Sequence, residues 1–111
     1  MKWYQDLYLS ENIADRSEKI KWKIRHRAGQ IDIFVIALAS NPKNLLDIIQ
    51  ARELLQRGYP TRELYIIGLS KGRDEAVNLS CDIIEEVYQA TGGFDIKAYL
   101  KIRQEQSGSA V

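Results

Sequence analysis

The fold of this chain is decided by the run Ile-Asp-Ile-Phe-Val-Ile-Ala-Leu-Ala at positions 31–39. After Asp32 every side chain in the run is apolar, so a strand formed here would be hydrophobic on both faces. Runs of this kind are typical of strands in a parallel sheet that helices cover on both sides. We therefore expect this segment to be the buried central strand of a sheet.

Two further segments of strand-like sequence lie on either side of this run. Residues 3–9 alternate between two faces, with aromatic side chains at every second position and polar residues among them, which predicts an edge strand. Residues 64–69 form a second apolar run. We expect this run to lie parallel to residues 31–39 and directly beside them.

Helical periodicity fills the intervals between these strands. The predicted helices cover about residues 12–28, from near Pro42 to before Gly58, and about residues 73–90. A shorter helix is expected at 94–102. The order β-α-β-α-β-α predicts an α/β fold of two or three layers, with a three-stranded, mainly parallel sheet.

The length and composition of the chain limit its organisation. Its 111 residues suffice for one domain, which we assign to residues 1–103, with residues 104–111 as a flexible C-terminal tail. The formal net charge of +1 provides no overall field that would attract nucleic acid or a membrane. One cysteine and one histidine cannot form an internal disulfide or a Cys/His zinc site. The N-terminus does not resemble a signal peptide and no long apolar window follows, which predicts a cytoplasmic protein without a membrane partner.

A serine follows each of the three predicted strands. Because the carboxyl ends of parallel strands meet at one edge of a sheet, we expect the three turns to lie together. Hydroxyl groups and the backbone N–H groups of helix starts at such an edge suit a small anion. The candidate ligand-binding residues are Ser10, Ser40, Asn41, Ser70, Lys71 and Gly72.

Residues 68–72, Gly-Leu-Ser-Lys-Gly, match the G-x-S-x-G pattern of a hydrolase nucleophile elbow. A serine nucleophile needs a base, which in that fold follows the serine in the chain. Here the single histidine, His26, precedes Ser70. We therefore interpret the motif as a glycine-assisted turn with a serine cap, and we assign no catalytic residue, metal or cofactor. Weak hydrolysis at Ser70 is the alternative.

The first predicted helix is rich in basic residues. Together with Trp22 and His26, these cations could form a surface for nucleic acid, which combines positive charge with a stacking ring. On the sequence the cations spread around the helix, and acidic residues of the last long helix balance them, which favours a solvated face with local salt bridges. We therefore do not expect a nucleic-acid partner. The cations are Arg16, Lys19, Lys21, Lys23, Arg25 and Arg27, and the acids are Asp82, Glu85 and Glu86.

Two apolar side chains are misplaced on their predicted helices. Trp22 points away from the stripe formed by Ile20 and Ile24, and His26 lies one turn further along the same side. Leu54 is similarly placed on the second predicted helix. An aromatic side chain that faces away from its own core is typical of a subunit interface. We expect these three outward-facing residues to contribute to a homodimer interface.

The long helix at 73–90 shows one broad apolar face, which we expect to be buried. Its members are Val77, Ser80, Cys81, Ile84, Val87 and Tyr88. A free cysteine in such a position behaves as a small apolar residue, so we expect no redox role for Cys81.

Four segments resemble a family of short uncharacterised single-domain proteins from clostridial-type bacteria, to which no function is assigned. The segments are YLSENI at 8–13, RAGQ at 27–30, NLLDI at 44–48 and EEVYQATGG at 85–93. The resemblance covers roughly residues 2–100. It implies an intact single-domain protein and supplies no catalytic residue.

The leading interpretation is a small cytoplasmic binding or protein-interaction module that forms a homodimer. The first alternative is a small-molecule or anion-binding protein, with or without weak hydrolysis, that uses the serine-capped edge of the sheet. The third interpretation is binding of nucleic acid through the basic first helix.

Overall fold

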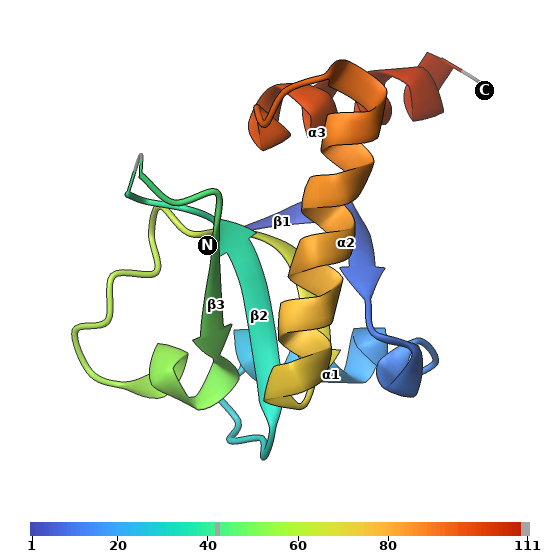
Figure 1. Cartoon of the computed structure of the whole chain (residues 1–111). Helices are drawn as coiled ribbons and strands as arrows, with labels where there is room; N and C mark the ends of the chain where they lie inside the picture. Colours follow the sequence, from blue (N-terminus) through green and yellow to red (C-terminus); the bar gives the residue numbers. More distant parts are fainter. Residues whose placement is uncertain (42, 110–111) are drawn as a thin grey trace.

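The computed structural model describes residues 1–41 and 43–109, and its architecture is mixed α/β. A four-stranded sheet lies between α1 on one face and the long helix α2 on the other (Figure 1). The strands are β1 (Lys2–Leu9), β2 (Ile33–Leu38), β3 (Leu46–Gln50) and β4 (Tyr65–Lys71). The α-helices are α1 (Ser17–Arg25), α2 (Arg73–Thr91) and α3 (Ile96–Ser109), and two short 3-10 helices are η1 (Glu11–Ile13) and η2 (Ala51–Leu55).

The strand order in the sheet is β1-β4-β2-β3. The apolar run at 31–39 supplies β2, an inner strand whose residues Ile33–Ala37 are all buried, as the sequence predicts. The edge position expected for residues 3–9 is also confirmed, since β1 pairs with β4 alone. β1 runs parallel to β4, whereas β2 runs antiparallel to both β4 and β3.

The expectation of a three-stranded, mainly parallel sheet is therefore wrong. The segment predicted as the second helix contains β3 instead, which returns along β2 as an antiparallel neighbour. The short helix η2 and the segment that follows it then bring the chain back before β4 begins. Because β3 crosses the sheet once more before β4 begins, β4 runs antiparallel to β2 and not parallel to it as expected. Pro42, which we expected in the first turn of that helix, lies outside the described residues.

Each face of the sheet has its own core. The first core contains Ile20 and Ile24 of α1 and Leu54 of η2, packed on one face of the strands. The second contains Ile83 and Val87 of α2, together with Ile96 and Leu100 of α3, on the other face. The basic helix α1 and the acidic residues of α2 consequently lie on opposite sides of the sheet.

α2 begins at Arg73 and ends at Thr91, close to the predicted bounds. Its buried stripe differs from the expected face, because Ala76 and Ser80 turn toward the sheet while Cys81 is exposed. Ala76, Ser80, Ile83 and Val87 make the contact with the sheet, and this leaves Val77 and Tyr88 exposed. The expectation that the whole apolar face is buried is wrong.

The C-terminal segment is helical further than expected. α3 continues to Ser109 and includes most of the segment 104–111 that we assigned to a tail. Residues 110 and 111 lie outside the described residues.

Candidate functional site

The three serine turns do not form a single site. Because β1 and β4 are parallel, Ser10 and Ser70 lie at the same end of the sheet, as expected. β2 runs in the opposite direction, so Ser40 and Asn41 lie at the other end. The predicted ligand-binding set is therefore divided into two groups by one reversed strand.

The turns at Ser10 and Ser70 form a closed local network. The Ser10 hydroxyl accepts a hydrogen bond from the Lys71 backbone N–H at 3.2 Å and donates to Asn12 Oδ1 at 2.6 Å. The Asn12 amide donates in turn to the Lys71 carbonyl at 3.1 Å. Ser10 and Ser70 are both buried. The Ser10 hydroxyl thus joins the ends of the two strands, and the hydrogen bonds of both buried hydroxyls are made within the protein.

The G-x-S-x-G motif has a structural explanation at each position. A Cβ atom on Gly68 would lie 3.1 Å from the Tyr8 carbonyl oxygen, so the close approach of β1 requires glycine. Ser70 is fully buried within β4 and donates to the Gly72 carbonyl at 3.4 Å. Gly72 has a φ of +91°, in the region that favours glycine. The buried hydroxyl cannot attack a substrate, so this geometry provides no nucleophile elbow.

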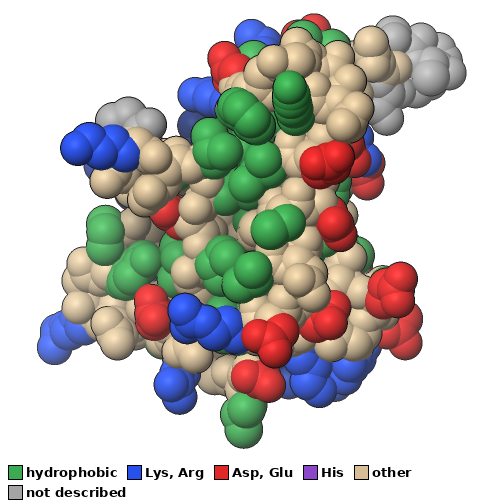
Figure 2. Space-filling model, viewed as in Figure 1, with side chains coloured by type: hydrophobic (Ala, Val, Ile, Leu, Met, Phe, Trp, Pro, Cys, Tyr) green, Lys and Arg blue, Asp and Glu red, His purple; other side chains and the backbone are tan. Residues whose placement is uncertain are grey.

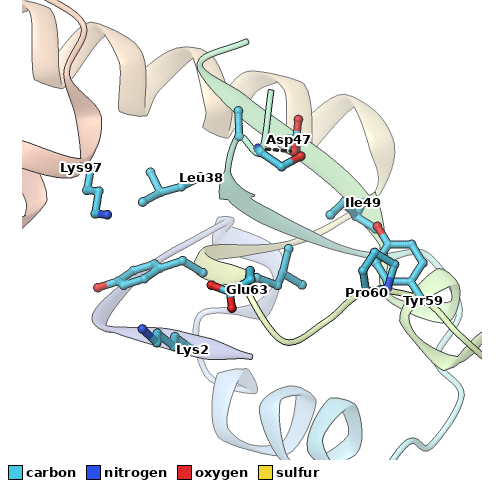
Figure 3. Close-up of a pocket in the computed structure, with 12 residues that line it drawn as sticks. Lys2, Leu38, Asp47, Ile49, Tyr59, Pro60, Glu63 and Lys97 are labelled. Carbon is cyan, nitrogen blue, oxygen red and sulfur yellow. Dashed lines mark hydrogen bonds between the residues drawn. The ribbon is translucent and has the colours of Figure 1, made fainter. Parts of the chain in front are cut away.

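A hollow with a volume of about 520 Å³ lies at the opposite end of the sheet. It is bounded by the starts of β1 and β4, the end of β2, β3, the segment at 59–64 and Lys97 of α3. Figure 3 shows Lys2 and Glu63 on one side, Asp47 on the other, and Tyr59 with Pro60 at one end. Asp47 accepts a hydrogen bond from the Ser40 backbone N–H at 3.3 Å. The hollow thus combines apolar walls with side chains of both charges.

A polar network joins β1 to the two helices on its face. The Glu86 carboxylate of α2 accepts hydrogen bonds from the hydroxyl groups of Tyr8 and Tyr99, the latter at 2.9 Å. Arg103 of α3 lies over the Tyr8 ring, with 4.9 Å between the guanidinium carbon and the ring centroid. The same guanidinium contacts Asp6 Oδ2 at 3.1 Å.

Both tyrosines of this network are held in the protonated form. Burial, together with the hydrogen bond to Glu86, raises the pKa of Tyr8 far above its ordinary value of 10.0. The same causes raise the pKa of Tyr99. Phenols with raised pKa values are poor acids that keep their protons, and they serve here as hydrogen-bond donors, so the network stabilises the fold rather than providing proton-transfer chemistry. Sequence analysis missed it because its members are distant in the chain.

The predicted interface residues have different surroundings. Leu54 is buried in the first core, because η2 replaces the predicted helix and directs this side chain inward. Its assignment to an interface is therefore wrong. Trp22 is 56% exposed, and its ring stacks on His26 with 4.0 Å between the centroids. Their participation in a subunit interface stays a prediction.

Several apolar side chains on α2 and β3 are exposed. Val77 and Tyr88 of α2 are 43% and 45% exposed, and Ile48 of β3 is 39% exposed. Figure 2 shows hydrophobic side chains gathered along α2 and toward the strands beside it. From the sequence we expected Val77, Cys81 and Tyr88 to be buried, so their exposure was not predicted. We call Ile48, Val77, Cys81 and Tyr88 the α2–β3 surface.

The described residues contain no group of His, Cys, Asp and Glu side chains that could hold a metal ion. Nor does the described part of the chain include a helix long and apolar enough to cross a membrane.

Comparisons with known proteins found no matching family model, no matching curated protein and no matching solved structure. The chemistry of the surfaces described above is therefore the basis for proposing a function.

Proposed function

We propose that this protein is a protein-interaction module that forms a homodimer through the α2–β3 surface. The observation that carries the proposal is the free edge of β3 beside exposed apolar side chains of α2. β3 pairs with β2 on one side, and within residues 1–41 and 43–109 no strand pairs with its other side. A regular strand edge with unpaired backbone groups is a template for pairing with another chain.

The side chains of β3 support an interface that includes α2. Leu46 packs with the second core, on the face that carries α2. Because alternate residues of a strand share a face, Ile48 points to the same side. Val77, Cys81 and Tyr88 of α2 are exposed on this side of the molecule as well. A partner strand along β3 would place its own apolar side chains against this flank of α2.

A second copy of the chain fits this surface better than a different partner. Ile48 is the middle residue of the five in β3. A two-fold axis beside Ile48 would pair two copies of β3 antiparallel, with the same residue from each copy at the centre. The two four-stranded sheets would then form one continuous sheet. This arrangement buries the apolar surplus of both copies without requiring any segment from elsewhere.

Sedimentation equilibrium of the wild type and the Ile48→Lys variant tests the proposal. The substitution places two ammonium groups at the axis, and we expect the dissociation constant to rise roughly thirtyfold or more, the effect of an interface hot spot. Ile102→Lys is the matched control, because Ile102 lies on α3 and is 51% exposed. It makes the same chemical change outside the α2–β3 surface.

Three results would contradict the proposal. They are a wild type that is monomeric at every concentration, an Ile48→Lys variant that dimerises as the wild type does, and equal weakening by Ile102→Lys. Weakening by Trp22→Ala without any effect of Ile48→Lys would locate the interface at Trp22 instead.

A second candidate function is the binding of a small ligand in the hollow shown in Figure 3. Its volume of about 520 Å³ lies within the range of small-molecule sites. Lysine and carboxylate side chains on its walls favour a ligand that carries both charges, such as an amino acid. Binding of a mixture of free amino acids, followed by NMR, should shift the amide signals of Leu38 and Tyr65. Shifts that are confined to the serine turn at Ser10 would argue against this hollow.

A further inference from the structure

A second hollow lies on the face of the sheet opposite α2 and has a volume of about 340 Å³. It is bounded by α1, the segment at 29–33 and the end of β4. Four cations line it, and none of its lining residues is acidic. The cations are Arg16, Lys19, Lys23 and Lys71. We call this hollow the α1 groove.

The positive charge of the α1 groove is largely uncompensated. Arg16 lies 4.0 Å from Asp15, in a pair whose side chains are both at least half exposed. Within the described parts of the chain, no carboxylate lies within ion-pair distance of Lys19, Lys23 or Lys71. The acidic residues of α2 that we expected to balance these cations are separated from them by the sheet. In the described parts of the chain, the pair of Arg16 with Asp15 is the one salt bridge that these cations form, and it does not involve α2.

The cations of α1 are also sorted into two sets. Lys21 and Arg25 lie over the Trp3 ring, at 5.3 and 5.6 Å from its centroid. Arg16, Lys19 and Lys23 follow one another at helical spacing along the groove. The cations therefore do spread around the helix, as the sequence predicts: Lys21 and Arg25 lie over Trp3, whereas Arg16, Lys19 and Lys23 form a stripe along the groove.

An aromatic pair lies next to this stripe on the same helix. Trp22 precedes His26 by four residues and follows Lys19 by three, so these side chains are neighbours on the helix surface. Trp22 is stacked on His26 and is still 56% exposed. A rigid, exposed ring beside a row of cations is the combination that binds single-stranded nucleic acid.

We propose that the α1 groove binds single-stranded nucleic acid, with phosphates along the cations and an unstacked base on the Trp22–His26 pair. From Arg16 to Lys23 the stripe extends roughly 10 Å along the helix axis, which is too long for one phosphate group to contact all of its members. A chain of phosphates is therefore the better ligand. A duplex would leave the exposed ring without a base to stack on, which favours a single strand.

This proposal is independent of the proposed homodimer. The α1 groove and the α2–β3 surface lie on opposite faces of the sheet, so both can be occupied at once. A dimer would carry two grooves. A variant at the α2–β3 surface should therefore change dimerisation and not oligonucleotide binding, and a variant in the α1 groove should do the reverse.

The test measures binding of labelled oligonucleotides of about 12 nucleotides, oligo-dT and oligo-U, by fluorescence anisotropy. Affinity should fall as salt rises, with a slope of about −2.8 in the double-logarithmic plot if each of the four cations neutralises one phosphate. The double variant Lys19→Gln/Lys23→Gln should reduce this slope to about −1.4. Trp22→Ala should weaken binding about fivefold or more at every salt concentration without changing the slope, and Trp22→Phe should recover part of the loss.

The matched control is the double variant Lys43→Gln/Lys101→Gln. It removes the same charge from exposed positions in the β2–β3 connection and on α3, and it should keep the slope of the wild type. The proposal is overturned if no oligonucleotide binds at about 50 mM salt, where such contacts are strongest. Equal losses in both double variants would also overturn it, as would binding to anionic vesicles in the absence of oligonucleotide binding.

Discussion

The two edges of the sheet differ in regularity and in what covers them. In β1, four residues lie between Trp3 and Tyr8, whereas only one lies between their partners Ile66 and Gly68 in β4. The additional residues form a bulge. In β3 every residue pairs in register with β2, from Leu46 to Gln50.

The bulged edge is tied to the C-terminal helix of the same chain. Arg103 of α3 contacts Asp6 at 3.1 Å, and Gln104 donates to Gln5 at 3.2 Å. Bulges and charged side chains both prevent a strand edge from pairing with another chain. The β3 edge has no bulge, although it carries one charged residue, Asp47, and its middle residue Ile48 is exposed. The β1 edge is tied to α3 within the monomer. The β3 edge is the one that is left to pair with a partner.

The largest expected effect is that of Leu100→Ala, which removes the contact that holds α3 beside β1. Leu100 is buried in the second core, so the free energy of unfolding should fall by about 2–5 kcal/mol. Ile102→Ala is the control, since this neighbour is half exposed and should change stability by no more than about 0.5 kcal/mol. Urea denaturation measures both. Similar losses for the two variants would show that α3 is not anchored through Leu100.

A smaller loss is expected for Gly68→Ala, where β4 meets the end of the bulge. The new Cβ would lie 3.1 Å from the Tyr8 carbonyl, so β1 must move, at a cost of about 1–3 kcal/mol. Gly29→Ala is the matched control, because no atom lies within 4 Å of its added Cβ and its φ is not positive. Its stability should stay the same or rise by up to about 1 kcal/mol. Equal changes in the stability of both variants would contradict a close contact between β1 and Gly68.

Hydrogen exchange should distinguish the two edges directly. In the proposed dimer the outer backbone amides of β3 are paired, so their exchange should slow by about tenfold or more as protein concentration rises, equivalent to about 1.4 kcal/mol. The amides of β1 should not depend on concentration. Ile48→Lys should abolish the dependence in β3. Concentration-independent exchange at both edges would show that neither pairs with a partner.

The smallest effect concerns the hydroxyl of Tyr8, at the end of the bulged strand. Tyr8→Phe removes its hydrogen bond to Glu86, which should cost about 1 kcal/mol at neutral pH. The pKa of Tyr8 is raised by burial and by this hydrogen bond, so the unfolded chain releases the proton at lower pH than the folded chain does. The stabilisation is complete below the unfolded pKa near 10 and is lost as pH rises further. Thermal unfolding between neutral and alkaline pH should therefore show a shallower decline for Tyr8→Phe, and an equal decline in both proteins would contradict this origin.

The part of the candidate site that could be predicted depended on local pattern. Ser10 and Ser70 meet because each ends an apolar strand and the two strands are parallel. Ser40 was assigned to the same edge because residues 45–55 show helical spacing of leucine and isoleucine. In the structure two isoleucines of that segment, Ile48 and Ile49, pair with β2 instead, since a strand partner outweighs a weak helical preference.

By itself the sequence determined which strand segments are buried and where α2 ends. The double-sided apolar run became an inner strand, and α2 ends at Gly92, which adopts the left-handed conformation that favours glycine. Only the tertiary structure decided the direction of the strands, the closure of one edge and the separation of the basic helix from the acidic one. The physical reason is that apolar periodicity and backbone preference are properties of neighbouring residues. Strand direction and edge closure depend on pairings such as Val35 with Leu69 and Asp6 with Arg103, which lie far apart in the chain.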